Sequence, residues 1–223
     1  MMRQVKAVLF DCDGVLIDSE VIAIGIEVAA LAKVGVHLTR AELADRYVGV
    51  SGSAMRRSVA KEFDVDLTDA FWNDLRDRSH AELTEEVRPV TGMAEVIERL
   101  TVPYCLASSS SHERIELSLE AAGLLHLFPP DLRFSAEDVD HGKPAPDLFL
   151  LAARSLGVDP ADCVVVEDSP YGVQAALAAE MDVIGFTGGG HADKAWAGRL
   201  RTAGATTIVT TADELEAELT PDL

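Results

Sequence analysis

The chain has 223 residues, with 38 acidic and 19 basic side chains, so its formal net charge is −19. A charge of this sign favours solubility and repels nucleic acids and anionic membrane surfaces, so neither is expected as a partner. It also repels a phosphorylated substrate, so a phosphate site would need a metal ion or a few local cations. Hydrophobic residues make up 48% of the chain, which is enough for a sizeable buried core.

The cysteines and the N-terminal residues indicate a cytoplasmic protein, which we expect to be a monomer. Cys12, Cys105 and Cys163 are odd in number and lie in or beside apolar runs, so a reducing compartment fits better than a disulfide framework. The first residues, MMRQVKAVLFDCDG, do not resemble a signal peptide, because their apolar run is short and is followed by acid. No stretch approaches the roughly 18 apolar residues of a membrane span.

Apolar runs that alternate with helical patterns predict a parallel sheet. We expect strands at 5–10, 102–107, 132–135, 163–167, 182–186 and 206–209. We expect helices at 93–100, at 112–122 and from about Pro146 to Gly157. A further helix should begin after Ser169, which can cap it, with Pro170 at its first position. Strands alternating with helices predict an α/β fold in which helices cover both faces of the sheet.

The segment from about Ser19 to Glu86 has a different character. It contains helical patterns such as EVIAIGIEVAALAKVG and AFWNDLRDRSHAELTEEV and no convincing strand. We interpret it as an all-helical domain inserted just after the first strand. The expected boundaries are 1–16 and 90–223 for the core domain and 17–89 for the inserted domain. The connections should lie near 15–19 and 86–92, where Gly14 and Gly92 can absorb a change of backbone conformation.

The residues beyond the carboxyl ends of the strands are the candidate site, because open parallel sheets bind ligands there. They are Asp11 and Asp13, the serines at 108–111, Lys143, Glu167 and Asp168. Carboxylates close together need a cation, and hard oxygen ligands without histidine or cysteine suit Mg²⁺. One carboxylate can attack phosphorus, while a second acid protonates the leaving oxygen. Lysine and serine can hold the other phosphate oxygens.

These residues lie in four motifs that resemble those of the haloacid dehalogenase-like superfamily. DCDGVLIDSE at 11–20 resembles motif one in its phosphatase form, and LASSSS at 106–111 resembles motif two. KPAPD at 143–147 resembles motif three, and VVVEDSPYG at 164–172 resembles motif four. The motifs occur in the family's order across the whole chain. DGVLIDSE together with KPAPDLF is similar to the subgroup of sugar-phosphate phosphatases and β-phosphoglucomutase.

The resemblance implies a Rossmann-like core with an inserted helical cap, and a Mg²⁺-dependent phosphatase that forms an aspartyl phosphate. By matching position, it makes Asp11 the nucleophile and Asp13 the general acid and base. The implied phosphate binders are Ser108, Ser109 and Lys143, and the choice among the serines at 108–111 stays open. The implied metal ligands are Asp11, Asp13, Asp168 and Glu167, with Glu167 as an outer or alternate ligand. An intact pair of acids at 11 and 13 disfavours a non-catalytic binding protein on this fold.

The cap should choose the substrate, and here the sequence departs from the family pattern. The candidate contacts are Gly49 and Ser51, in a segment resembling the family's specificity loop, together with Arg76 and Arg78. Gly52 stands where the family often has a basic residue, and Ala23 stands where phosphoglucomutase members carry a histidine. We therefore expect hydrolysis of a small sugar or polyol phosphate. A phosphosugar mutase is the alternative.

Two further residues are given structural roles. Asp18 is expected to cap the first cap helix and to hold the hinge, without touching the substrate. Cys12 is expected to be packed and unreactive, because the carboxylates on either side of it raise its pKa.

Overall fold

Six parallel strands form a single sheet in the computed structural model, which describes residues 5–219. The strands are β1 (Ala7–Phe10), β2 (Tyr104–Ser108), β3 (Arg133–Ser135), β4 (Cys163–Glu167), β5 (Asp182–Phe186) and β6 (Thr207–Val209). Their order is β3-β2-β1-β4-β5-β6, so the direction of winding reverses at β1. Such a reversal opens a crevice at the carboxyl ends of the strands, where ligands bind.

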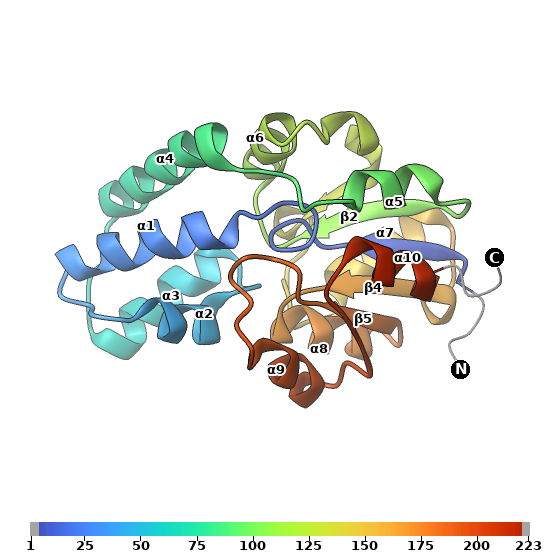
Figure 1. The fold of residues 1–223 in the computed structure, drawn as a ribbon. Helices are drawn as coiled ribbons and strands as arrows, with labels where there is room; N and C mark the ends of the chain where they lie inside the picture. The colour runs from blue at the N-terminus through green and yellow to red at the C-terminus, as the bar shows by residue number, and fades with distance from the viewer. Residues whose placement is uncertain (1–4, 220–223) are drawn as a thin grey trace.

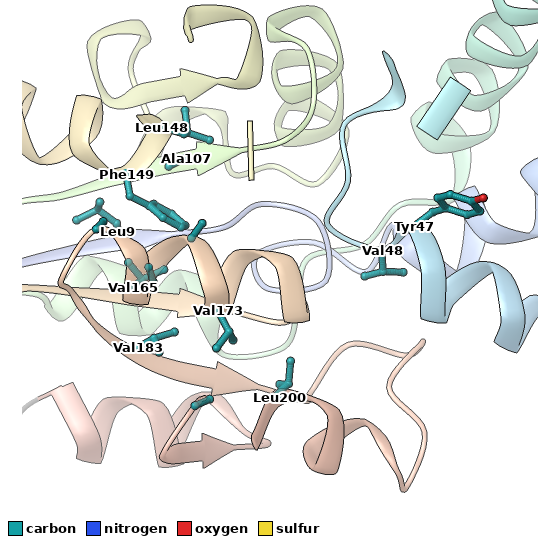
Figure 2. Packing of buried hydrophobic residues seen from close by; sticks show 14 of the residues in the cluster. Leu9, Tyr47, Val48, Ala107, Leu148, Phe149, Val165, Val173, Val183 and Leu200 are labelled. Carbon is teal, nitrogen blue, oxygen red and sulfur yellow. The ribbon is translucent and has the colours of Figure 1, made fainter. Parts of the chain in front are cut away.

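Helices cover both faces of the sheet, because the strands are apolar on both sides. One layer contains α5 (Met93–Arg99), α6 (His112–Ala121) and α10 (Ala212–Leu219), and the other contains α7 (Asp147–Leu156), α8 (Pro170–Ala178) and α9 (Trp196–Ala203) (Figure 1). Ala7 and Leu9 belong to the buried cluster that includes α7 and α8, whereas Val8 and Phe10 belong to the cluster that includes α5 and α6. Figure 2 shows Leu9 beside Phe149 of α7. The alternation along β1 thus divides the core into two layers.

The insertion between β1 and α5 is built from helices. They are α1 (Glu20–Lys33), α2 (Arg40–Tyr47), α3 (Gly52–Phe63) and α4 (Asp69–Glu86), and they lie together beyond the end of β1 (Figure 1). Local sequence fixes the helix starts: Thr39 and Glu42 form a capping box on α2, and Thr68 caps α4. The expected all-helical cap inserted into an α/β core is therefore confirmed. The domain boundaries given above stay a prediction.

Short 3₁₀ turns complete the described secondary structure at Leu125–Leu127, Pro130–Leu132, Ala136–Asp138 and Pro160–Asp162. Within residues 5–219, no helix combines the length and the apolar composition needed to cross a bilayer.

Two crossings of the chain connect the cap to the core, and they are hydrogen-bonded to each other. The N–H of Asp18 donates to the carbonyl of Arg88, and the N–H of Val90 donates to the carbonyl of Leu16, both at 2.9 Å. Gly14 at φ +76° and Gly92 at φ +83° lie beside these crossings, in the left-handed conformation that favours glycine. The chain therefore enters and leaves the cap through one paired segment.

The expected role of Asp18 is wrong in one respect. The N-terminal cap residue of α1 is Ser19, not Asp18. The Asp18 carboxylate instead accepts a hydrogen bond from the backbone N–H of Gly190, at 2.9 Å. Asp18 thus ties the first crossing to the loop after β5.

Candidate active site

Asp11 and Lys143 form the buried centre of the site. Asp11 directly follows β1, and the ammonium of Lys143 donates to its Oδ1 at 2.8 Å. The same ammonium donates to Glu167 at 2.7 Å and to the carbonyl of Ala107 at 3.0 Å. Asp11 is only 4% exposed and Lys143 only 5%. Charge-assisted hydrogen bonds from one lysine therefore join the ends of β1, β2 and β4.

Three buried carboxylates meet at this point. One oxygen from each of Asp11, Glu167 and Asp168 lies within 4.8 Å of the others. Burial raises the pKa of Asp11 to about 7; Lys143 opposes this effect, and Glu167 adds to it. Burial also raises the pKa of Asp168 well above its usual range, with further contributions from Glu167 and Asp11. Excess buried negative charge of this kind is relieved by a bound cation.

The donor set fits Mg²⁺. Three buried carboxylates share this edge with the ammonium of Lys143, and the buried Oδ2 of Asp168 makes no well-aligned hydrogen bond with a described residue, so the Asp168 carboxylate as a group lacks positive partners. All the converging donors are carboxylate oxygens, which a hard cation such as Mg²⁺ prefers.

Glu167 makes hydrogen bonds through both of its oxygens. One oxygen accepts from Lys143, and the other accepts from the N–H of Ser169 at 2.8 Å and from its hydroxyl at 2.9 Å. Gly172 provides the space for this carboxylate, because a Cβ at that position would lie 1.7 Å from Oε1 of Glu167. The sequence left open whether Glu167 is an outer residue or an alternate ligand of the metal. Because both of its oxygens are already hydrogen-bonded, these contacts favour the outer position.

Asp13 faces the cap and is held by three partners. Its carboxylate accepts hydrogen bonds from the hydroxyls of Ser19 and Ser110 and from the guanidinium of Arg114, the last at 2.9 Å. Burial alone would raise the pKa of Asp13, but Arg114 and the two hydroxyls outweigh burial and lower it. Arg114 also donates to Ser79 of α4 at 3.1 Å. The same guanidinium therefore connects Asp13 to the cap.

The serines after β2 have different partners. The Ser109 hydroxyl donates to the carbonyl of Gly49 in the cap at 2.8 Å. Ser110 donates to Asp13, and Ser111 caps α6. Ser108 is buried, and its hydroxyl oxygen accepts from the N–H of Ser110 at 3.1 Å. All four line the cavity described below, so the choice of phosphate-binding serine remains a prediction.

A cavity of about 570 Å³ lies between cap and core. Its lining includes Asp11 and Asp13, the predicted cap residues Gly49, Ser51 and Arg76, and the apolar side chains Met55, Trp72 and Leu75. Arg78 is not among the lining residues. This volume suits a small metabolite, and Asp11 and Asp13 stand at one side of it.

Sequence reasoning missed several residues that the structure brings to the site. Glu20 and Glu27 of α1 line the cavity, two helical turns apart on one face. Arg114 reaches Asp13 from the first turn of α6. Its place three residues after Ser111, in the serine run of motif two, is the local signal that could have brought it to the site. His191 lies 3.2 Å from Asp168, and only the run of glycines before it marked its loop as unusual.

Cys12 is buried between the two catalytic candidates. Burial, followed by the charges of Asp13 and Asp11, raises the pKa of its thiol well above the usual value. This agrees with the expected packed and unreactive role. The three cysteines of the chain are all free and buried.

The fold and the site together define a hydrolase with a Rossmann-like core and a helical cap. The sequence model of the haloacid dehalogenase-like hydrolase family matches residues 8–186, so the chain belongs to this family. The 6-phosphogluconate phosphatase of Escherichia coli K12 is 31% identical, over 85% of this chain and 86% of its own length. Hexitol phosphatase B of the same organism is 34% identical, over 80% of this chain and 82% of its own length.

Solved structures agree with this assignment. A haloacid dehalogenase-like protein of unknown function from Agrobacterium tumefaciens C58 is 36% identical with a TM-score of 0.83, and 97% of this chain and 98% of that chain are covered. A hydrolase of the same family from Deinococcus radiodurans R1, with bound phosphate and sodium, is 36% identical with a TM-score of 0.75, over 97% and 96% of the two chains. The predicted family and the predicted enzyme class, a phosphoric monoester hydrolase, are confirmed.

The position of Glu27, half-buried in the wall of the cavity, predicts a dependence of stability on pH. Burial raises the pKa of Glu27 from 4.5 to about 7, with Arg114 opposing and Asp13 adding to the effect. Between these two values the unfolded chain ionises Glu27 while the folded protein keeps it protonated, so the free energy of unfolding falls as pH rises. Glu27→Gln removes this loss. We expect the variant's gain over wild type to be larger at pH 8 than at pH 4 by about 1–3 kcal/mol.

Urea denaturation at the two pH values measures the difference. Glu82→Gln, on the exposed surface of α4, is the matched control and should show no such change with pH. An equal gain for Glu27→Gln at both pH values would contradict the prediction.

Proposed function

We propose that the enzyme hydrolyses a small sugar or polyol phosphate in a Mg²⁺-dependent reaction, through an aspartyl phosphate on Asp11. The observation that carries the proposal is the buried cluster of Asp11, Glu167 and Asp168, in which Asp11 contacts Lys143 and the negative charges outnumber the positive one. The cluster adjoins a cavity of metabolite size. Relatives named as phosphatases of 6-phosphogluconate and of hexitols support the substrate class.

Asp11 and Asp168 would hold the metal, together with the backbone carbonyl of Asp13 that the family resemblance implies, and Glu167 would support them. When bound, the metal neutralises charge on the phosphate oxygens and orients them. Lys143 supplies a second positive charge at 2.8 Å from Asp11. Fixed positive groups aimed at the place where negative charge develops are the main source of rate enhancement in such reactions.

The reaction has two steps. In the first, a carboxylate oxygen of Asp11 bonds to phosphorus, the bond from phosphorus to the leaving oxygen breaks, and Asp13 gives that oxygen a proton. In the second, Asp13 takes a proton from a water molecule, the water oxygen bonds to phosphorus, and the bond from phosphorus to Asp11 breaks, which releases phosphate and regenerates the Asp11 carboxylate. The contacts from Arg114, Ser19 and Ser110 favour ionised Asp13, the form that activates water.

Closure of the cap over the core would exclude bulk water during these steps. Four contacts join the core to the cap: Ser109 to the Gly49 carbonyl, Tyr171 to the Arg46 carbonyl at 3.2 Å, Arg114 to Ser79, and Arg199 to Asp45 at 2.8 Å. They reach the cap from the loop after β2 and from α6, α8 and α9.

The cavity wall favours hydrolysis over a mutase reaction. A mutase must hold the distal phosphate of a bisphosphate, which calls for a positioned cation in the cap. Ala23 stands where phosphoglucomutase members of the family carry a histidine, and Gly52 stands where the family often has a basic residue. Both line the cavity and carry no charge. Arg57 and Arg76 of the cap line it too, but both are exposed, and Arg76 pairs with the adjacent Asp77 at 3.0 Å.

Metal removal tests the proposed cofactor. EDTA should abolish hydrolysis of p-nitrophenyl phosphate, and added Mg²⁺ should restore it, because the buried carboxylates would otherwise repel the phosphate. Circular dichroism in EDTA serves as the control that the fold is kept. Full activity in EDTA after exhaustive dialysis would sink the proposal.

Substitution of the two acids separates their roles. Asp11→Asn should reduce turnover to background, because an amide cannot form the phosphoenzyme. Asp13→Asn should lower kcat by about 10²–10⁴-fold with a much smaller change in KM, the usual contribution of general acid and base catalysis. Asp74→Asn, on the exposed side of α4, should retain full activity.

A fluoroberyllate adduct locates the nucleophile directly. Fluorine NMR should detect it in wild type and in Asp13→Asn, but not in Asp11→Asn. An adduct located on any serine would refute the assignment.

Product analysis distinguishes hydrolysis from phosphoryl transfer. With β-glucose 1-phosphate and a glucose bisphosphate primer, we expect free phosphate to exceed glucose 6-phosphate, because the cap lacks a buried cation at the positions above. Both products are followed in one reaction. Accumulation of glucose 6-phosphate with negligible free phosphate would instead establish the mutase.

A further inference from the structure

His191 is buried directly against Asp168. Its Nε2 lies 3.2 Å from Oδ2 of Asp168, and both side chains are 1% exposed. Neither ring nitrogen of His191, nor Oδ2 of Asp168, makes a well-aligned hydrogen bond with any described residue. A buried polar group without a partner is costly. Nε2 of His191 and Oδ2 of Asp168, which face each other at 3.2 Å, are therefore each other's available hydrogen-bond partners.

The surroundings of the pair hold it in a fixed place. Trp196 of α9 packs edge-on against the His191 ring, with ring centres 5.0 Å apart and planes at 89°. The indole N–H of Trp196 donates to the backbone carbonyl of Asp168 at 2.6 Å. Trp196 thus fixes both the ring of His191 and the backbone of its partner.

The glycines before His191 let its loop approach motif one. A Cβ on Gly189 would lie 2.9 Å from the carbonyl oxygen of Gly14, and a Cβ on Gly190 would lie 2.7 Å from the carboxylate of Asp18. The hydrogen bond from the Gly190 N–H to Asp18 holds the loop in this position. A side chain at either glycine would push the loop, and with it the His191 ring, away from Asp168.

We propose that His191 is a positioning residue for the divalent metal: its Nε2–H donates to Oδ2 of Asp168 and leaves the other oxygen of that carboxylate for the ion. The inference rests on the proposed Mg²⁺ dependence. Carboxylates that ligate metals are themselves hydrogen-bonded, and these outer partners fix the ligand's orientation. Without His191, the Asp168 carboxylate is free to turn, and metal binding must then restrict that rotation.

Titration of the metal-stripped, full-length protein with Mn²⁺ tests the inference without reference to activity. His191→Leu should weaken Mn²⁺ binding by about 10–100-fold, the effect typical of losing an outer partner. His191→Gln keeps an N–H donor near the Nε2 position and should stay much closer to wild type. His126→Leu, at an exposed histidine of the core domain, is the matched control and should bind Mn²⁺ as wild type does.

Three outcomes of the titration would overturn the inference. Wild-type affinity in His191→Leu would remove the role altogether, and equal weakening in the Leu and Gln variants would reduce it to packing. A wild-type protein that binds no Mn²⁺ would refute the metal proposal itself, which separates that failure from the first two. Nitrogen NMR of wild type needs no variant: we expect the Nε2–H tautomer of His191, and an Nδ1–H tautomer would contradict the hydrogen bond.

Discussion

Buried negative charge at the point where the winding of the sheet reverses is the constraint on which the site depends. Three carboxylates, Asp11, Glu167 and Asp168, share this edge with a single buried ammonium, that of Lys143. Charges in a low-dielectric interior are costly unless they are paired. Lys143 and the groups of Ser169 satisfy Glu167, so the remaining deficit falls on Asp168. The fold thus places excess buried negative charge at the end of the strands, where a cation can neutralise it.

The contacts between cap and core follow a different logic. Ser109 and Tyr171 both donate to backbone carbonyls of the cap, those of Gly49 and Arg46. Because a carbonyl is present whatever the side chain, these contacts place the cap independently of its composition. Under the proposed function, the side chains that line the cavity would then select the substrate. Arg114 and Arg199 differ, because Arg114 bonds to the side chain of Ser79 as well as to Asp13, and Arg199 pairs with the side chain of Asp45.

Much of the core was predictable, because its strands are short apolar runs with charged ends. The expected bounds 163–167 and 182–186 are those of β4 and β5. By contrast, α9 and α10 were not predicted; α9 includes Gly198, and glycine is a poor helix former. The cap helices α2 and α3 were anticipated only as part of a helical segment.

The site divides in the same way. Residues that directly follow strands were found from the sequence, because their position depends only on local pattern. Arg114 and His191 were missed, because they reach their partners from other elements of the fold. Asp18 shows most clearly what local pattern cannot predict. Its side chain bonds to Gly190, 172 positions away, whereas capping rules consider only residues within a few positions.

The pairing of the two crossings has a consequence for how such an enzyme can diversify. Because the segments at 16–18 and 88–90 bond to each other, the inserted stretch begins and ends at one place on the core. A different inserted segment would need only to begin and end at these two neighbouring segments. The strand register of the sheet and the cluster of Asp11, Glu167, Asp168 and Lys143 would then be unchanged. Under the proposed function, the cap's share of the cavity wall could therefore change while the reacting groups of the core stay in place.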